Sequence, residues 1–210
     1  MTRFLFDGEA GAPVTVLLAH GAGAAMDTPF MAGLAAALAG CGLRVARFEF
    51  AYMAARRTGG PKRPPPKVEV LSAEYAAALA DLPGAGRVVV GGKSMGGRVA
   101  SLIADEAFAA GRIAGLACFG YPFHPQGKPE KLRTEHLAGL RTPALICQGT
   151  RDPFGTQEEV AGYALSERIA LHWLGDGDHD FAPRRRVTGL TQADHLSAAA
   201  RACAGWARGL

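Results

Sequence analysis

The sequence has no apolar run long enough to cross a lipid bilayer. Its longest mostly apolar stretch, residues 31–43, is shorter than the ~20 residues that a membrane-spanning helix needs. Residues 1–13 carry Asp7 and Glu9 where a signal peptide would have its apolar region. We therefore expect a soluble, cytoplasmic protein with no membrane partner.

Cysteines spaced like metal ligands are also lacking. The chain has 4 cysteines, and no two of them form a C-x-x-C pair. A reducing compartment and buried free thiols fit this spacing better than a metal site or a disulfide set. We expect no metal and no cofactor. The four are Cys41, Cys118, Cys147 and Cys203.

Basic residues are only slightly in excess, which gives a formal net charge of +4. They are spread along the chain, with local concentrations at residues 61–67 and 184–186. Neither concentration is interleaved with aromatic residues or belongs to a motif that reads nucleic acid, so both are expected to be solvated loops. No nucleic-acid partner is expected.

Short β-rich runs alternate with longer alanine-rich stretches of helical period. This alternation predicts parallel strands joined by helical crossovers, and the near-continuous apolar runs suit a sheet that is covered on both faces. We predict one domain over residues 1–210, with a doubly wound, mostly parallel β-sheet and helices on both faces. The expected strands are residues 14–19, 43–48, 87–91, 113–119, 144–148 and 169–174, with residues 4–6 as an edge strand. Apolar residues at helical spacing predict helices around residues 31–38, 70–79, 99–108 and 191–208.

Two long irregular segments, residues 49–67 and 120–142, follow predicted strands. Ligands bind at the carboxyl ends of the strands in such sheets. Long loops without their own structure are uncommon in compact domains. Both segments are therefore expected to overhang a functional site.

The stretch VVVGGKSMGG, residues 88–97, allows two interpretations. A phosphate-binding loop that ends in Gly92-Lys93-Ser94 needs glycine at position 87, where the chain has Arg87. Its loop would also have to form from residues 88–91, which already belong to a valine-rich strand. The same residues fit a G-x-S-x-G nucleophile elbow, in which strand, sharp turn and helix follow each other directly.

In an elbow, bulky side chains two positions before and after the nucleophile would clash, and Gly92 and Gly96 remove these clashes. Ser94 is therefore the predicted nucleophile. Its backbone lies at a helix N-terminus, where the amide of Met95 can face a developing oxyanion. A second donor is expected from the loop after residues 14–19, which reads His20-Gly21-Ala22-Gly23; the amide of Ala22 is the candidate, and His20 is interpreted as a structural turn residue.

A serine hydroxyl needs a base, and the fold predicts the chain order serine, acid, histidine. Asp152 follows the predicted strand 144–148, and His179 lies in a Gly- and Asp-rich loop after strand 169–174. Both are predicted members of a catalytic triad. Their alternatives are an Asp-Pro turn former and a solvent-exposed loop histidine, respectively.

With these elements the chain resembles the α/β-hydrolase superfamily, and within it the small lidless branch similar to dienelactone hydrolases. The stretches GGKSMGGR, RFEFAYMAARR and GYPFHPQGKPEKLR look like a narrower group that includes testis-expressed proteins and a regulatory subunit of the nonspecific-lethal chromatin complex. The resemblance implies an α/β-hydrolase fold without a cap domain and the triad Ser94, Asp152 and His179. Dienelactone hydrolases proper carry a cysteine nucleophile, so that activity does not transfer simply.

We expect a serine hydrolase that cleaves a carboxylic ester or thioester of a small substrate through an acyl-enzyme. The alternative is a non-catalytic scaffold that binds a protein partner through its overhanging loops. Lys93 is unusual at its position and is expected either to pair with Glu49 beneath the site or to face solvent. Four residues on the long loops are the candidates for pocket walls, with loop packing as their alternative: Tyr52, Tyr121, Phe123 and His124.

Overall fold

A seven-stranded sheet forms the centre of the computed structural model, which describes residues 1–84 and 86–210. The strand order is β1-β3-β2-β4-β5-β6-β7; β1 pairs antiparallel with β3, and the other neighbours are parallel. The predicted doubly wound fold class and all seven strands are confirmed, with ends that shift by at most two residues. The strands are β1 (Phe4–Asp7), β2 (Val14–Ala19), β3 (Arg44–Phe48), β4 (Arg87–Lys93), β5 (Gly115–Phe119), β6 (Ala144–Gly149) and β7 (Ile169–Leu174).

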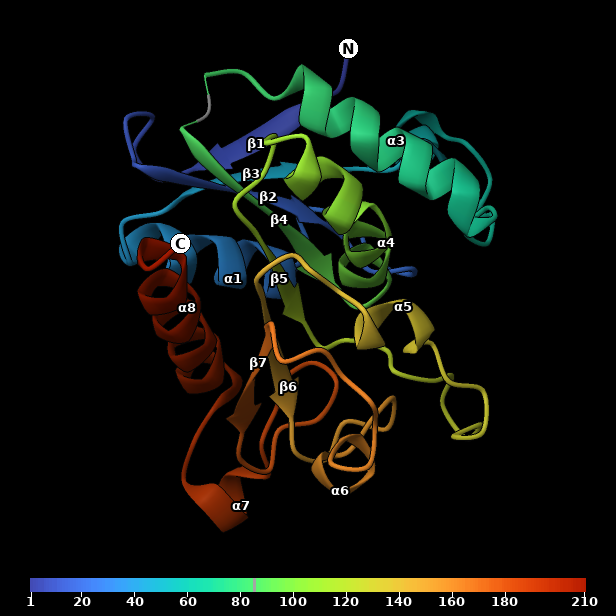
Figure 1. Cartoon of the computed structure of the whole chain (residues 1–210), viewed down its shortest axis with the longest axis vertical. Coiled ribbons are helices and arrows are strands. Elements are labelled where there is room, and N and C mark those ends of the chain that lie inside the picture. The colour runs from blue at the N-terminus through green and yellow to red at the C-terminus, as the bar shows by residue number, and fades with distance from the viewer. Residues whose placement is uncertain (85) are drawn as a thin grey trace.

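Four longer helices cover the two faces of the sheet, as expected. Helices α1 (Pro29–Gly40) and α8 (Gln192–Arg208) pack together on one face, and α3 (Val68–Asp81) and α4 (Met95–Ala109) pack together on the other (Figure 1). Each pair closes its own apolar layer against the sheet. The central strand β2 is therefore buried along its whole length, which explains its uninterrupted apolar sequence.

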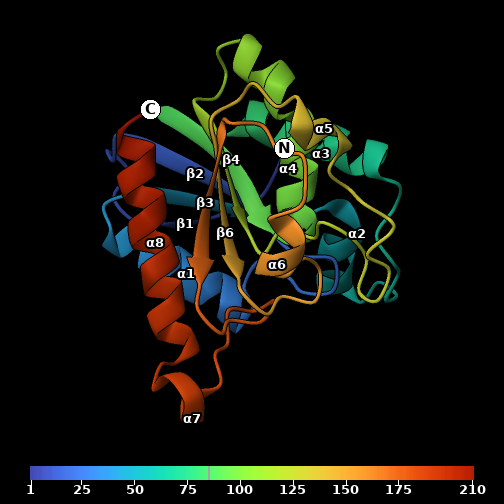
Figure 2. The ribbon, with the colours of Figure 1, turned by 60° about the horizontal axis from the view of Figure 1, so that its bottom comes forward.

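The two long loops contain short helices. Residues 49–67 include α2 (Ala51–Ala54) and the 3-10 helix η1 (Ala55–Thr58), and residues 120–142 include α5 (Glu135–Ala138). Two more short helices, α6 (Gln157–Val160) and α7 (Arg185–Thr188), follow β6 and β7. The arrowheads of β4, β6 and β7 end on the same side of the sheet, so the loops that follow these strands gather there (Figure 2).

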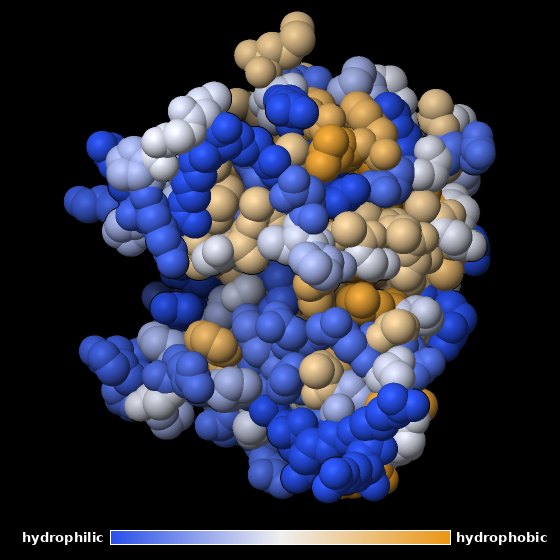
Figure 3. Space-filling view, turned by 180° about the vertical axis from the view of Figure 1, so that it is seen from behind, coloured by the Kyte–Doolittle hydropathy of each residue, from blue (hydrophilic) through white to orange (hydrophobic). Residues whose placement is uncertain are grey.

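The surface opposite to the view of Figure 1 is hollowed between an upper and a lower part, with hydrophilic residues around much of the hollow (Figure 3). Among the residues that the structure describes, no helix combines the length and the apolar character that crossing a membrane requires. The 4 cysteines are free thiols, and three of them are buried.

A buried tyrosine ties α3 to the two central strands. The hydroxyl of Tyr75, fully buried, lies 2.7 Å from the carbonyl oxygen of Leu17 in β2 and 2.8 Å from that of Gly91 in β4. It also accepts a hydrogen bond from the amide of Gly91 at 2.8 Å. Because no water reaches this point, the hydroxyl satisfies backbone groups that would otherwise lack a partner.

Removing this hydroxyl should destabilise the sheet at its centre. We expect Tyr75→Phe to lower the free energy of unfolding by about 1–3 kcal/mol, because buried backbone groups lose their partner. Urea denaturation followed by circular dichroism measures the change. Tyr163→Phe is the matched control, since Tyr163 is partly exposed and its hydroxyl bonds to no other described residue; equal losses in both variants would contradict the role given to Tyr75.

Candidate active site

The turn between β4 and α4 has the geometry of a nucleophile elbow. Ser94 connects the two elements with φ 52° and ψ −117°, a conformation that non-glycine residues rarely adopt. A Cβ atom on Gly92 would lie 2.6 Å from the carbonyl oxygen of Ala19, and one on Gly96 would lie 2.5 Å from the same oxygen. The steric reason for both glycines is thus confirmed, and it involves β2 as well as the elbow itself.

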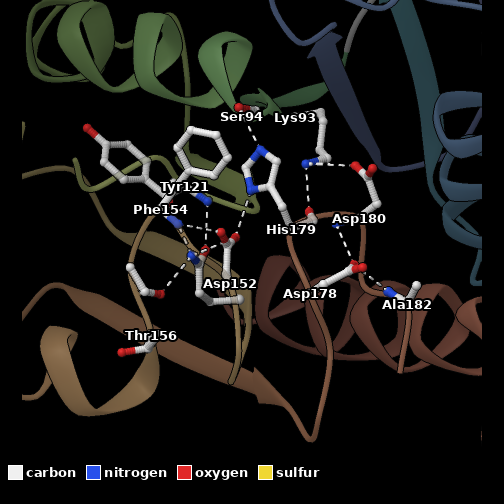
Figure 4. Close-up of polar contacts among 12 residues, drawn as sticks. Lys93, Ser94, Tyr121, Asp152, Phe154, Thr156, Asp178, His179, Asp180 and Ala182 are labelled. Carbon is white, nitrogen blue, oxygen red and sulfur yellow. Dashed lines mark hydrogen bonds and ion pairs between the residues drawn. The ribbon is translucent and has the colours of Figure 1, made fainter. Parts of the chain in front are cut away.

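Ser94, His179 and Asp152 form one chain of hydrogen bonds. The Nε2 atom of His179 lies 2.9 Å from Oγ of Ser94, and its Nδ1 atom lies 2.8 Å from Oδ2 of Asp152 (Figure 4). The carboxylate can only accept, so Nδ1 carries the proton and Nε2 is left to accept the hydroxyl proton of Ser94. The structure thus brings together the three residues predicted as a triad.

Asp152 is fully buried and held by two donors besides the histidine. Nε2 of Gln148 donates to Oδ2 at 2.9 Å, and the amide of Phe154 donates to Oδ1 at 2.9 Å. The ring of Phe154 also packs against that of His179, with 4.3 Å between centroids. The sequence reasoning did not identify Gln148, although a polar residue within an otherwise apolar strand end was a usable signal.

The two expected oxyanion donors border the same cavity as Ser94. Met95 is the first residue of α4, and Ala22 lies in the loop after β2. Neither amide donates a hydrogen bond to another described residue, so both are free to bind a ligand oxygen. The hydroxyl of Tyr52 donates to the carbonyl oxygen of Ala22 at 2.8 Å and thereby fixes this loop.

His20 has a structural position at the base of that loop. It is fully buried; Nε2 accepts the amide of Phe50 at 3.2 Å, and Nδ1 lies 2.7 Å from the carbonyl oxygen of Gly21. Burial lowers the pKa of the His20 imidazole, which keeps it neutral in this arrangement. The interpretation of His20 as a turn residue agrees with these contacts.

A cavity of about 470 Å³ opens beside Ser94, but the expected walls do not line it. Tyr121, Phe123 and His124 are buried beneath the surface, and the rings of Tyr121 and Phe123 lie 4.9 Å apart. Their assignment as pocket walls was wrong, and the alternative, loop packing, holds for these three residues because the loop turns their side chains inward. Tyr52 contacts the Ala22 loop and is not among the described lining residues. These are Ala22, Pro65, Pro66, Val68, Leu71, Ser94, Met95, Arg98, Val99, Pro122, Arg133 and Phe154.

Lys93 is buried, with 6% of its surface exposed, and does not pair with Glu49. Its Nζ atom donates to the carbonyl oxygen of His179 at 2.7 Å and lies 3.3 Å from Oδ1 of Asp180 (Figure 4). Glu49 instead binds Arg57, with 2.6 Å between Oε2 and Nε. Both expectations for Lys93 were therefore wrong: its side chain points toward the histidine loop, away from solvent and from Glu49.

Burial lowers the pKa of the Lys93 ammonium group, and the negative charge of Asp180 opposes this effect. The lysine thus holds the loop of His179 through a backbone carbonyl. Elsewhere in that loop, the Asp178 carboxylate accepts the amides of Asp180 and Ala182, both at 2.9 Å. The position of His179 is consequently set by contacts on both sides.

No group of three or more His, Cys, Asp or Glu side chains suited to hold a metal ion occurs within residues 1–84 and 86–210. The ionisable side chains at the site are those of the hydrogen-bonded chain, Lys93 with its partner, and two arginines on the cavity wall, Arg98 and Arg133. The sequence reasoning did not identify these two arginines. The arrangement is suited to proton transfer from a serine hydroxyl.

Comparisons with known proteins identify a matching family and similar folds. A family described as "Alpha/beta hydrolase domain" matches residues 12–208. A dienelactone hydrolase from Anabaena variabilis is similar at 22% identity and TM-score 0.68, over 96% of this chain and 88% of that one. A lidless α/β serine hydrolase from Xanthomonas campestris is similar at 18% identity and TM-score 0.68, over 98% and 94% of the two chains.

The esterase domain of a Rhodothermus marinus protein is a third similar structure, at 17% identity and TM-score 0.68, over 98% of this chain and 92% of that one. At these identities the solved structures show a shared fold. The expected fold without a cap domain is confirmed, as is the likeness to lidless, dienelactone-hydrolase-like proteins. The narrower likeness to the testis-expressed group stays a prediction.

The buried charge of Lys93 should be visible in the pH dependence of stability. Because its pKa is lowered in the folded state, the unfolded chain binds more protons between that lowered pKa and 10.5, so the wild type should gain stability as pH rises through this window. Lys93→Met lacks this gain. Urea denaturation between about pH 7 and about pH 10 measures the difference.

Lys62→Met removes an exposed lysine and is the control. Like the wild type, Lys62→Met should gain stability as pH rises through this window. If all three proteins changed in parallel with pH, the lowered pKa of Lys93 would be contradicted.

Proposed function

The chain belongs to the α/β hydrolase domain family, and from this premise we propose that it is a serine hydrolase acting on a carboxylic ester or thioester. The hydrogen-bonded chain from Ser94 through His179 to Asp152, at 2.9 and 2.8 Å, carries the proposal. A serine hydroxyl in this setting has a base within reach, and the base is oriented by a buried carboxylate.

The first half of the proposed reaction forms an acyl-enzyme. Oγ of Ser94 attacks the carbonyl carbon of the substrate while Nε2 of His179 takes the hydroxyl proton. The amide of Ala22, in the loop after β2, and the amide of Met95, at the N-terminus of α4, donate hydrogen bonds to the resulting oxyanion. These two hydrogen bonds stabilise its negative charge. When the tetrahedral intermediate collapses, the bond to the leaving group breaks, and His179 gives its proton to the departing oxygen or sulfur.

The second half returns the enzyme to its starting state. A water molecule gives a proton to Nε2 of His179 and attacks the acyl carbon, and the second tetrahedral intermediate releases a carboxylic acid. The proton then returns to Oγ of Ser94. Throughout, Asp152 keeps Nδ1 protonated and stabilises the imidazolium ion.

A small substrate is proposed because of the size and openness of the cavity. Its volume of about 470 Å³ lies in the range of small-molecule sites, and its wall is mostly apolar. The fold neighbours that are named esterase and dienelactone hydrolase support an ester-cleaving reaction. The cytoplasmic location expected from the cysteines stays a prediction.

Labelling with a fluorophosphonate probe tests the proposal, because only an activated serine reacts readily. We expect one adduct per chain in the wild type, measured by intact-protein mass spectrometry, and none in Ser94→Ala. Ser197→Ala, on α8 at the opposite face of the sheet, is the control and should react like the wild type. Absence of an adduct on folded wild-type protein would favour the alternative, a non-catalytic scaffold that binds a protein partner.

His179→Ala should separate an activated serine from an exposed one. The hydroxyl of Ser94 loses its base, so the labelling rate should fall by about 1000-fold or more. The rate of probe incorporation at fixed pH measures the change. A His179→Ala rate equal to that of the wild type would show that His179 does not activate Ser94.

A further inference from the structure

Two arginine side chains on the cavity wall have no role in the proposed reaction steps. Arg98 and Arg133 both line the cavity that contains Ser94, and none of the described lining residues carries a carboxylate. Neither arginine forms a salt bridge with any described residue. The cavity therefore combines a mostly apolar wall with two positive charges that the protein does not neutralise.

Arg98 is placed by the elbow itself. It lies four residues after Ser94, and its amide donates to the carbonyl oxygen of Ser94 at 3.0 Å. Residues four apart share one face of a helix, so Arg98 stands one turn along α4 from the nucleophile. Its Nε atom is buried and has no hydrogen-bond partner among the described residues. This atom is closed off from solvent, whereas the two terminal nitrogens of Arg98 are not buried and form no hydrogen bond to a described residue, so they are the atoms that a ligand in the cavity can reach.

Arg133 is placed by the buried aromatic residues of the loop 120–142. Its amide donates to the carbonyl oxygen of Phe123 at 2.7 Å, and its carbonyl oxygen accepts the hydroxyl of Tyr121 at 3.2 Å. Burial, and then the charge of Arg98, lower the pKa of the Arg133 guanidinium, which stays charged in proteins all the same. The two like charges thus lie close enough to repel each other.

Some other arginines of the chain pair with a carboxylate. Arg47 pairs with Asp7 at 2.9 Å, Arg57 with Glu49 at 2.6 Å, and Arg151 with Asp176 at 2.8 Å. An outer groove also borders both Arg98 and Arg133, and its one acidic residue, Glu135, pairs with neither of them. Arg98 and Arg133 are distinguished by their place, since both border the cavity that contains Ser94 and no described carboxylate pairs with either of them.

We propose that Arg98 and Arg133 bind a carboxylate of the substrate, so that the hydrolysed compound is an ester or thioester that carries a second, negatively charged carboxyl group. This inference rests on the proposed function and names its substrate class. A bound carboxylate offsets the like charges of the pair and fits the planar arrangement of donors on a guanidinium group.

A carboxylate fits this wall better than a phosphate group. Phosphate sites in proteins commonly use backbone amides in addition to side chains. The free amides of Ala22 and Met95 bind the oxyanion in the proposed reaction, and three other lining residues, Pro65, Pro66 and Pro122, have no N–H to donate. Two guanidinium forks can satisfy the two oxygens of a carboxylate, and the remaining wall can hold the apolar part of the molecule.

Matched pairs of esters test the proposal. One pair is p-nitrophenyl hydrogen glutarate and p-nitrophenyl methyl glutarate, which places the charge on the acyl side. The other is 3-(butyryloxy)benzoate and its methyl ester, which places it on the leaving group. We expect the wild type to show a kcat/KM about 10-fold to 100-fold higher for the charged member of at least one pair, in line with a charge-assisted contact.

Arg98→Gln and Arg133→Gln should each remove most of this preference, because kcat/KM should fall about 10-fold more for the charged member of the pair than for the neutral member. Arg201→Gln removes an exposed charge on α8 and is the control for net charge. Arg133→Lys keeps a positive charge and should retain part of the preference, which guards against a variant that merely misfolds. Equal rates for both members of both pairs, or equal loss for charged and neutral esters, would overturn the proposal.

Binding to Ser94→Ala tests the carboxylate site without any turnover. Isothermal titration with monomethyl glutarate should show binding that dimethyl glutarate lacks and that additional Arg98→Gln or Arg133→Gln abolishes. If no ester is hydrolysed and no fluorophosphonate adduct forms, the proposed function fails, whereas this titration still decides on the carboxylate site. Binding of both compounds alike, or of neither, would overturn the site itself.

Discussion

The close contact between the elbow and β2 is the constraint on which the site depends. The carbonyl oxygen of Ala19 lies where a side chain on either Gly92 or Gly96 would have to be, so strand, turn and helix can approach only because these positions are glycine. This approach holds Ser94 at φ 52° and starts α4 at the next residue. The same start places the amide of Met95 beside the nucleophile and Arg98 one turn beyond it. One steric contact therefore positions the proposed nucleophile, a proposed oxyanion donor and a proposed substrate-binding residue.

A second constraint links the nucleophile strand to the histidine loop. Lys93, the last residue of β4, donates to the carbonyl oxygen of His179, and Gly120 leaves room for this contact, since a Cβ there would lie 3.0 Å from that oxygen. The buried ammonium group is unfavourable by itself, as its lowered pKa shows, and Asp180 compensates it in part. Lys93 thus holds the loop that carries His179. This contact helps to keep Nε2 of His179 at 2.9 Å from Oγ of Ser94.

The sequence predicted the sheet and the triad because both depend on local patterns. Buried parallel strands are continuous apolar runs, and the residues after them must gather at one edge. Ser94 was predicted from the G-x-S-x-G motif after such a strand, and Asp152 and His179 from their order in the chain and their places after two other strands. Side-chain direction in long loops depends on contacts with distant segments, which no local pattern encodes. Glu49 was therefore considered as a partner of Lys93 although Arg57 binds it, and Tyr121, Phe123 and His124 were candidates for the pocket walls although they are buried beneath the surface. Arg98 shares a helix face with Ser94, so its placement was within reach of the sequence; that of Arg133 was not.

The buried aromatic residues also explain why the loop 120–142 can present a fixed charge. The rings of Tyr121 and Phe123 pack against each other and belong to the apolar core on the α3 and α4 side of the sheet, against which Tyr163 also packs. Both backbone groups of Arg133 bond to this core, so little backbone freedom remains to be lost when a ligand binds. The loop thus keeps its guanidinium group near that of Arg98 despite their repulsion. The folded loop keeps both arginines on one cavity wall, where the charge of Arg98 disfavours that of Arg133. A bound anion would offset this unfavourable interaction.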